Sequence, residues 1–92
     1  MADRTERLLA DLAAKLEATA QLPVERTAAR WLGEAQAVAT DLTRGDPDAE
    51  TVARRVGHVV DLLDNVEDTG HPEADDHVAA AKRLAADLLE DQ

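Results

Sequence analysis

Residues that could bind a metal ion gather in the second half of the chain: His58, Asp61, His71, Asp75 and His77. Imidazole and carboxylate groups are ligands for divalent cations, and the three-residue spacing of His58 and Asp61 places both on one side of a helix. The aspartates at 61, 64 and 68, however, fall opposite the apolar stripe of the same expected helix. Metal sites inside helical bundles need carboxylates that project inward. We therefore predict no metal or cofactor site, and we interpret His77, at the edge of an apolar face, as a half-buried core histidine.

The all-helical nucleotide pyrophosphohydrolases of the MazG kind are also small acidic bundles, so their metal-site motif is compared with this sequence. Their metal site resembles an E-E-x-x-E element followed by E-x-x-D on the next helix. This chain approximates it only by Asp61-x-x-Asp64 and Glu67-Asp68, which share one outward face, and the first element has no counterpart. The sequence also has no Ser, Cys or Tyr nucleophile, and its glycines are isolated at 33, 45, 57 and 70, unlike a phosphate-binding loop. We predict that the protein is not an enzyme. A divalent-metal-dependent or nucleotide-hydrolysing bundle that uses the His and Asp residues remains the alternative.

A row of small residues is the second candidate for function. Ala29, Gly33 and Ala37 follow one another at four-residue spacing, with Thr40 alongside. A glycine inside a helix costs about 1 kcal/mol relative to alanine, so Gly33 calls for an explanation. One explanation is that a second helix approaches closely there, as in other small-x-x-x-small contacts. The other is that an alanine-rich sequence simply tolerates two glycines, this one and Gly57, where Ala53 repeats the four-residue spacing. The first interpretation predicts a contact with a protein partner or with a second copy in a homodimer.

Helix signals place these residues on four helices, expected over residues 3–20, 23–44, 47–68 and 72–90. Asp3 and Glu6 have the spacing of a capping box at the first helix. Pro23 and Pro47 are suited to the first helical turn, the latter with Asp46 as N-cap. Short connections make successive helices antiparallel neighbours. The sequence therefore predicts an all-α fold, a four-helix bundle with up-down topology that forms one domain over residues 1–92.

Apolar stripes predict which side of each helix faces the core. On the second helix the predicted stripe consists of Val24, Ala28, Trp31, Ala35, Val38 and Leu42. On the third helix it consists of Val52, Val56, Val59, Leu63 and Val66, with Val60 and Leu62 beside it. Because its apolar arc is the widest, the third helix is expected to be the most buried.

The charge of the chain is strongly negative and unevenly placed. The chain has twenty Asp and Glu residues and ten Lys and Arg residues, for a net charge of −10. Residues 1–45 hold seven acids and six bases, and residues 46–92 hold thirteen acids and four bases. A field of this sign repels phosphate backbones and anionic lipids, so we expect no nucleic-acid and no membrane partner. Without a signal-peptide-like apolar run or an uncharged stretch long enough to span a bilayer, the chain is expected to be cytoplasmic.

The acidity of the chain has two interpretations. Abundant acid, only two lysines, and very few aromatic residues are typical of proteins adapted to molar salt, where charge repulsion is screened. Alternatively, an acidic domain can act as a decoy that imitates nucleic acid on a basic surface. A decoy would align its acids on one face, whereas here they spread over all exposed faces, so salt adaptation is preferred.

Two short segments carry a resemblance to known proteins. Leu22-Pro23-Val24-Glu25 and the stretch from Arg30 to Ala35 resemble segments of small, uncharacterised helical proteins of halophilic archaea. The resemblance covers about a quarter of the chain and includes no catalytic motif. It implies a halophilic host and no particular activity.

Overall fold

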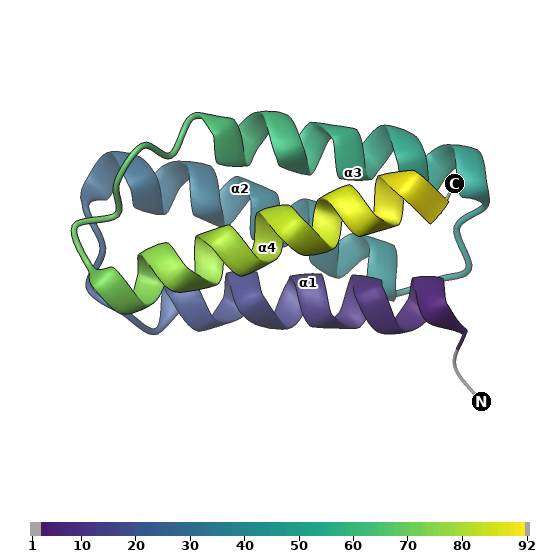
Figure 1. Ribbon diagram of the computed structural model, residues 1–92, viewed down its shortest axis with the longest axis horizontal. Coiled ribbons are helices and arrows are strands. Elements are labelled where there is room, and N and C mark those ends of the chain that lie inside the picture. Colours follow the sequence, from purple (N-terminus) through teal and green to yellow (C-terminus); the bar gives the residue numbers. More distant parts are fainter. Residues whose placement is uncertain (1–2, 92) are drawn as a thin grey trace.

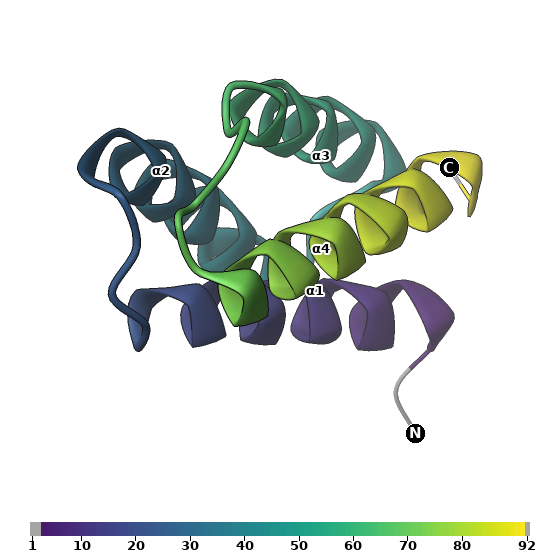
Figure 2. The ribbon, with the colours of Figure 1, turned by 60° about the vertical axis from the view of Figure 1, so that its left-hand side comes forward.

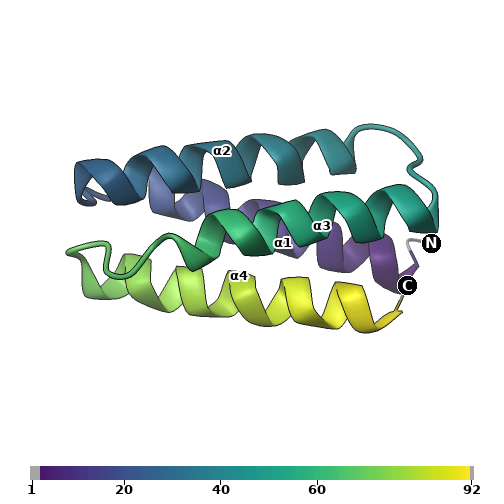
Figure 3. The ribbon, with the colours of Figure 1, turned by 90° about the horizontal axis from the view of Figure 1, so that it is seen from above.

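The computed structural model describes residues 3–91, which form four helices in up-down order (Figure 1). The helices are α1 (Arg4–Ala20), α2 (Arg26–Thr43), α3 (Ala49–Asp64) and α4 (Pro72–Asp91). Seen from above, each helix runs antiparallel to the one before it (Figure 3). The prediction of an all-α four-helix bundle is confirmed.

The helices pack in a closed ring. Helix α1 packs directly against α2 and α4, and α3 packs against the same two; within residues 3–91 no Cα atoms of the diagonal pairs lie within 8 Å of each other. Figure 2 shows the four helices surrounding a common centre. The first residue of α1 and the last of α4 also meet, because Arg4 Nε lies 2.6 Å from Asp91 Oδ2. That bond raises the pKa of the Arg4 guanidinium, chiefly by the hydrogen bond itself and then by the charge of Asp91.

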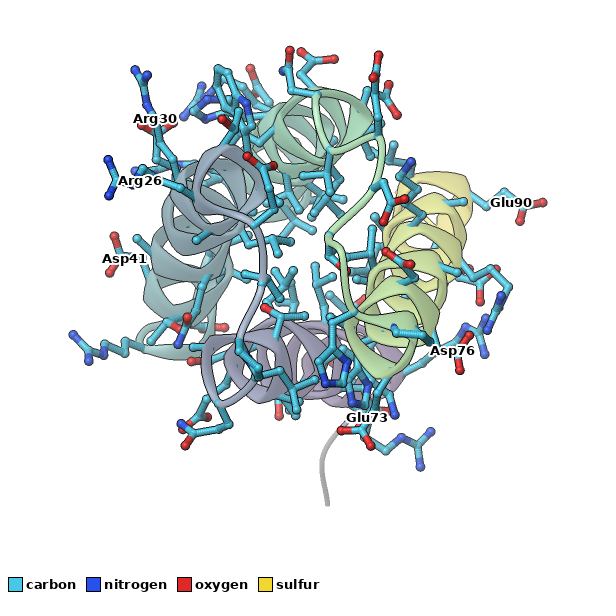
Figure 4. All side chains as sticks on the ribbon, turned by 90° about the vertical axis from the view of Figure 1, so that its left-hand side faces the viewer. Arg26, Arg30, Asp41, Glu73, Asp76 and Glu90 are labelled. Carbon is cyan, nitrogen blue, oxygen red and sulfur yellow. The ribbon has the colours of Figure 1, made fainter. Side chains whose placement is uncertain are left out.

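The core combines large side chains from two helices with small ones from the other two. Helix α1 contributes leucines such as Leu12 and Leu16, and α3 contributes valines and leucines such as Val56. Helices α2 and α4 bury mainly alanine, for example Ala35 and Ala81, both fully buried. Each helix with large core residues thus packs between two helices with small ones. In the end-on view the apolar side chains meet inside the ring and the charged ones point outward (Figure 4).

Helix α2 is turned slightly about its axis relative to the predicted stripe. Its buried residues are Ala28, Leu32, Ala35, Ala39 and Leu42. Trp31 and Val38, which the sequence placed at the centre of the stripe, are half-buried and pack at the edge of the core. The Arg30 guanidinium carbon lies 5.4 Å from the centre of the Trp31 ring. An edge position leaves the large indole partly covered by a cation, while the smaller residues enter the core.

Helix α2 also begins three residues later than predicted. Its N-cap is Glu25, whose carboxylate accepts hydrogen bonds from the backbone N–H groups of Thr27 and Ala28. Pro23 lies in the connection before it. The backbone N–H of Glu25 donates to the carbonyl oxygen of Thr69 at 2.7 Å, and this bond to another connection ties down residue 25 outside the helix.

Helix α3 is shorter than predicted at both ends. It begins at Ala49, because Asp48 rather than Asp46 is the N-cap and accepts from Thr51 N at 2.8 Å. It ends at Asp64, four residues before the predicted end, with Asn65 as C-cap. The chain then leaves the helix, although Val66 still points into the core as its stripe predicts. By contrast, α1 begins one residue after its predicted start, with Asp3 accepting from Glu6 N at 2.8 Å, and α4 ends one residue later than expected.

No helix in residues 3–91 combines the length and the apolar character needed to cross a lipid bilayer.

Candidate interaction surface

The small residues of α2 lie on the side of the helix that faces away from the core. Ala29, Gly33 and Ala37 are exposed, and Thr40 is half-buried. We call these four residues the α2 face. A Cβ atom placed on Gly33 would meet no heavy atom within 4 Å from other parts of the described chain. The packing of the bundle therefore gives no reason for the missing side chain.

A shallow depression continues the α2 face toward the end of α1. Its volume is about 330 Å³. Leu22, Pro23 and Val24 form one wall, from the connection between α1 and α2, and Ala29 and Gly33 form the other. The lining is thus mostly apolar, and its size suits one or two side chains of a partner. The sequence did not predict this depression, because the depression forms only when Pro23 and Val24 lie outside the helix.

Charged side chains border the α2 face in a definite order. Arg26 and Arg30 lie in the first half of α2, and Asp41 lies near its end. All three project away from the bundle, on the opposite side from Glu90 of α4 (Figure 4). Glu34 is the only other ionisable residue within the helix, so α2 carries two bases and two acids. Helix α4, in contrast, carries six acids and two bases.

The residues considered for metal binding do not converge. In the described part of the chain, no three side chains of His, Asp or Glu are placed to hold a metal ion. His58 and Asp61 are exposed on α3, while His71 and His77 are half-buried near the start of α4. The carboxylate of Asp75 accepts hydrogen bonds from Thr69.

A hydrogen-bonded node around Thr69 joins the two connections at one end of the bundle. Thr69 is fully buried, and its carbonyl oxygen accepts from Glu25 N. Its backbone N–H donates to Asp75 Oδ1 at 3.0 Å, and its hydroxyl lies 2.7 Å from the same oxygen and 2.9 Å from the His71 carbonyl. The hydroxyl also accepts from His71 N at 3.1 Å.

These bonds stabilise the ionised carboxylate of Asp75. The pKa of Asp75 is therefore lowered, chiefly by the backbone hydrogen bond from Thr69 and then by the bond from its hydroxyl. From the sequence, Asp75 was considered only as a candidate metal ligand, and its bonds to Thr69 were not predicted. In the residues that the structure describes, His71 Nδ1 is buried without a hydrogen-bond partner. The node fixes the connection before α2 and so shapes the wall of the depression.

The chain was compared with known proteins. A search of the curated proteins and a search of the solved structures found no match. A family model, described as a domain of unknown function (DUF8152), matches residues 8–92. Because the match covers α2, α3, α4 and all of α1 after its first four residues, the chain belongs to the DUF8152 family.

Proposed function

We propose that this domain is a non-catalytic protein-interaction module that docks a partner on the α2 face. The observation that carries the proposal is Gly33. A glycine in mid-helix costs about 1 kcal/mol relative to alanine, and the internal packing around Gly33 has room for a larger residue. An external backbone that approaches α2 closely supplies the missing reason for glycine.

The neighbourhood of Gly33 is suited to such a contact. Ala29 and Ala37 keep the surface flat one turn before and one turn after the glycine, so a partner helix can lie against the α2 backbone. The depression beside Leu22 and Val24 can receive an apolar side chain from the partner. The charged residues at the border would then define how the partner is oriented.

Photo-crosslinking tests the proposal directly. A benzoylphenylalanine in place of Ala37 should form a specific adduct in an extract of the native cells, with a second copy or with another protein. Ala86, an exposed alanine in the middle of α4, is the matched control position. Equal adducts at both positions, or none at position 37, would contradict the proposal.

A pair of glycine variants separates docking from folding. Gly33 and Gly57 both lie inside helices, and apart from its immediate neighbours in the helix a Cβ added at either would meet no heavy atom of residues 3–91 within 4 Å. Gly33→Leu and Gly57→Leu should therefore both leave the fold intact, but only Gly33→Leu should abolish the adduct at position 37. Loss of the adduct in both variants would show that the α2 face is not specific.

The acidic composition supports a second part of the proposal, that the domain works in the cytoplasm of a halophilic host. A net charge of −10 on 92 residues with only two lysines keeps a protein hydrated when salt is molar. The melting temperature of the purified protein across a KCl series tests this part.

A further inference from the structure

We infer that the partner on the α2 face is the α2 face of a second copy of this chain, with the two helices antiparallel across a two-fold axis. This inference rests on the proposed function and names its partner. Three features of α2 support the inference: its charges, their order along the helix and the small residues between them.

The net charge of the chain limits where two copies can meet. Each copy carries −10, so they repel unless the contact is made by a region with little net charge. Helix α2 carries two bases and two acids within its 18 residues. Helix α4, with six acids and two bases, would place like charges against like. Helix α1, with three bases and three acids, is equally balanced, and the exposed Gly33 is what favours α2 over α1.

The order of the charges then selects the orientation. Arg26 is near the start of α2 and Asp41 near its end, and both point away from the bundle (Figure 4). If Gly33 and Glu34 lie at the two-fold axis, Arg26 of one copy lies opposite Asp41 of the other, and symmetry repeats the pair. Parallel helices would instead place Arg26 against Arg26. Helix α2 is thus self-complementary only in the antiparallel arrangement.

The remaining charges fit the same arrangement. Arg30 and Glu34 are one helical turn apart on one flank of α2. Near the axis, Glu34 of each copy then lies between Arg30 of its own helix and Arg30 of the second copy. The two Glu34 carboxylates meet at the axis, and an Arg30 on either side of them offsets the repulsion between them.

The size of the contact predicts its strength. Helix α2 is about 27 Å long at 1.5 Å per residue, and one helix pair buries less than the roughly 1,600 Å² of a standard stable interface. Gly33 lets the two backbones approach closely, but the contact area stays small. We expect a reversible dimer with a dissociation constant on the order of 10 µM, in the range of small interfaces.

Sedimentation velocity between about 5 µM and 1 mM protein in 1 M KCl, where net repulsion is screened, tests the inference. Arg26→Asp and Asp41→Arg should each weaken the dimer about tenfold, because each places two like-charge pairs at the contact. The double variant R26D/D41R should restore the affinity to within about threefold. Glu90→Arg, which changes the charge as Asp41→Arg does but lies on the far side of the bundle, should not weaken the dimer.

Disulfide trapping gives an independent readout of orientation, because the chain has no cysteine of its own. Gly33→Cys should link two copies on mild oxidation, whereas Ala29→Cys should not, since antiparallel helices separate the two copies of position 29 by about 13 Å along the axis. Equal linking at both positions would indicate parallel helices and overturn the inference.

The outcomes distinguish this inference from the proposed function. A chain that stays monomeric up to 1 mM overturns the inference, and the crosslinking at Ala37 then decides whether another protein binds. A dimer that Gly33→Leu abolishes but the charge variants leave unchanged overturns the antiparallel arrangement alone. A dimer that is insensitive to Gly33→Leu overturns both.

Discussion

The side chain of Asp75 on α4 accepts two hydrogen bonds from Thr69, one from its backbone N–H at 3.0 Å and one from its hydroxyl at 2.7 Å. Thr69 is fully buried and its hydroxyl also accepts from His71 N, so Thr69→Val removes the side-chain bond to Asp75 and leaves His71 N without its partner. We expect this change to lower the free energy of unfolding by about 1 to 3 kcal/mol. Urea unfolding followed by circular dichroism measures it.

Thr43→Val is the matched control for this change. Thr43 is exposed, and its hydroxyl bonds only to the carbonyl of Thr40 in its own helix. Its removal should alter the free energy of unfolding by less than about 0.5 kcal/mol. A similar effect of both substitutions would mean that the node around Thr69 has no special role in the fold.

The lowered pKa of Asp75 gives a pH dependence with a definite sign. Because the folded-state pKa lies below the unfolded one, the contribution of Asp75 to stability is complete above about pH 4 and is lost as the pH falls through the folded-state pKa. Asp48 and Glu25, whose pKa values are lowered by hydrogen bonds from the starts of α3 and α2, act in the same direction. In Asp75→Asn the loss of stability between about pH 4 and pH 2 should be smaller than in the wild type. Thermal melts of both proteins across this pH range measure the difference. If the melting temperatures of the two fall equally as the pH is lowered, Asp75 does not contribute as proposed.

The glycines should respond to alanine in opposite ways. Gly33→Ala and Gly57→Ala should each raise the free energy of unfolding of the monomer by up to about 1 kcal/mol, because the new methyl group meets nothing and helix propensity improves. Gly70→Ala should lower it by about 1 to 2 kcal/mol, because Gly70 has φ of +77° in the connection before α4. Dilute samples avoid any effect of association. A destabilising Gly33→Ala would indicate that the glycine is needed inside the bundle.

Stability should rise with salt. The bundle measures 35 × 24 × 19 Å, so a Debye length of about 30 Å in 10 mM salt lets each charge act across the whole molecule, whereas about 3 Å in 1 M salt confines it to its neighbours. We expect the melting temperature to increase from millimolar to molar KCl. A melting temperature that does not change with KCl would remove the support for a halophilic host.

The local signals in the sequence were sufficient to predict the four helices and the bundle. Asp3 marked the start of α1 within one residue, and Pro72 marked the start of α4. At α3 two aspartates flank Pro47, and local rules do not decide between Asp46 and Asp48 as N-cap. The structure selects Asp48, whose side chain reaches Thr51 N.

Contacts between distant segments account for what the sequence did not predict. The start of α2 depends on the bond from Glu25 N to Thr69 O, which joins residues far apart in the chain. The rotation of α2 depends on how much space its neighbours leave, so Leu32 is buried while Trp31 lies at the edge. The exposed position of Gly33 followed from its helical spacing alone. The depression beside it did not, because Pro23 was expected inside the helix.

The ion pair between Arg4 and Asp91 joins the start of α1 to the end of α4 and so completes the ring of helices. The end of α4 lies beside the start of α1, so each helix contacts the helix that follows it around the ring. The chain could therefore begin and end in another connection without changing how the helices pack. A circular permutant that joins these two ends by a short linker and opens at Gly45 would retain all four helix–helix contacts. The same bundle could equally be inserted into a surface loop of another protein, entering and leaving at one place.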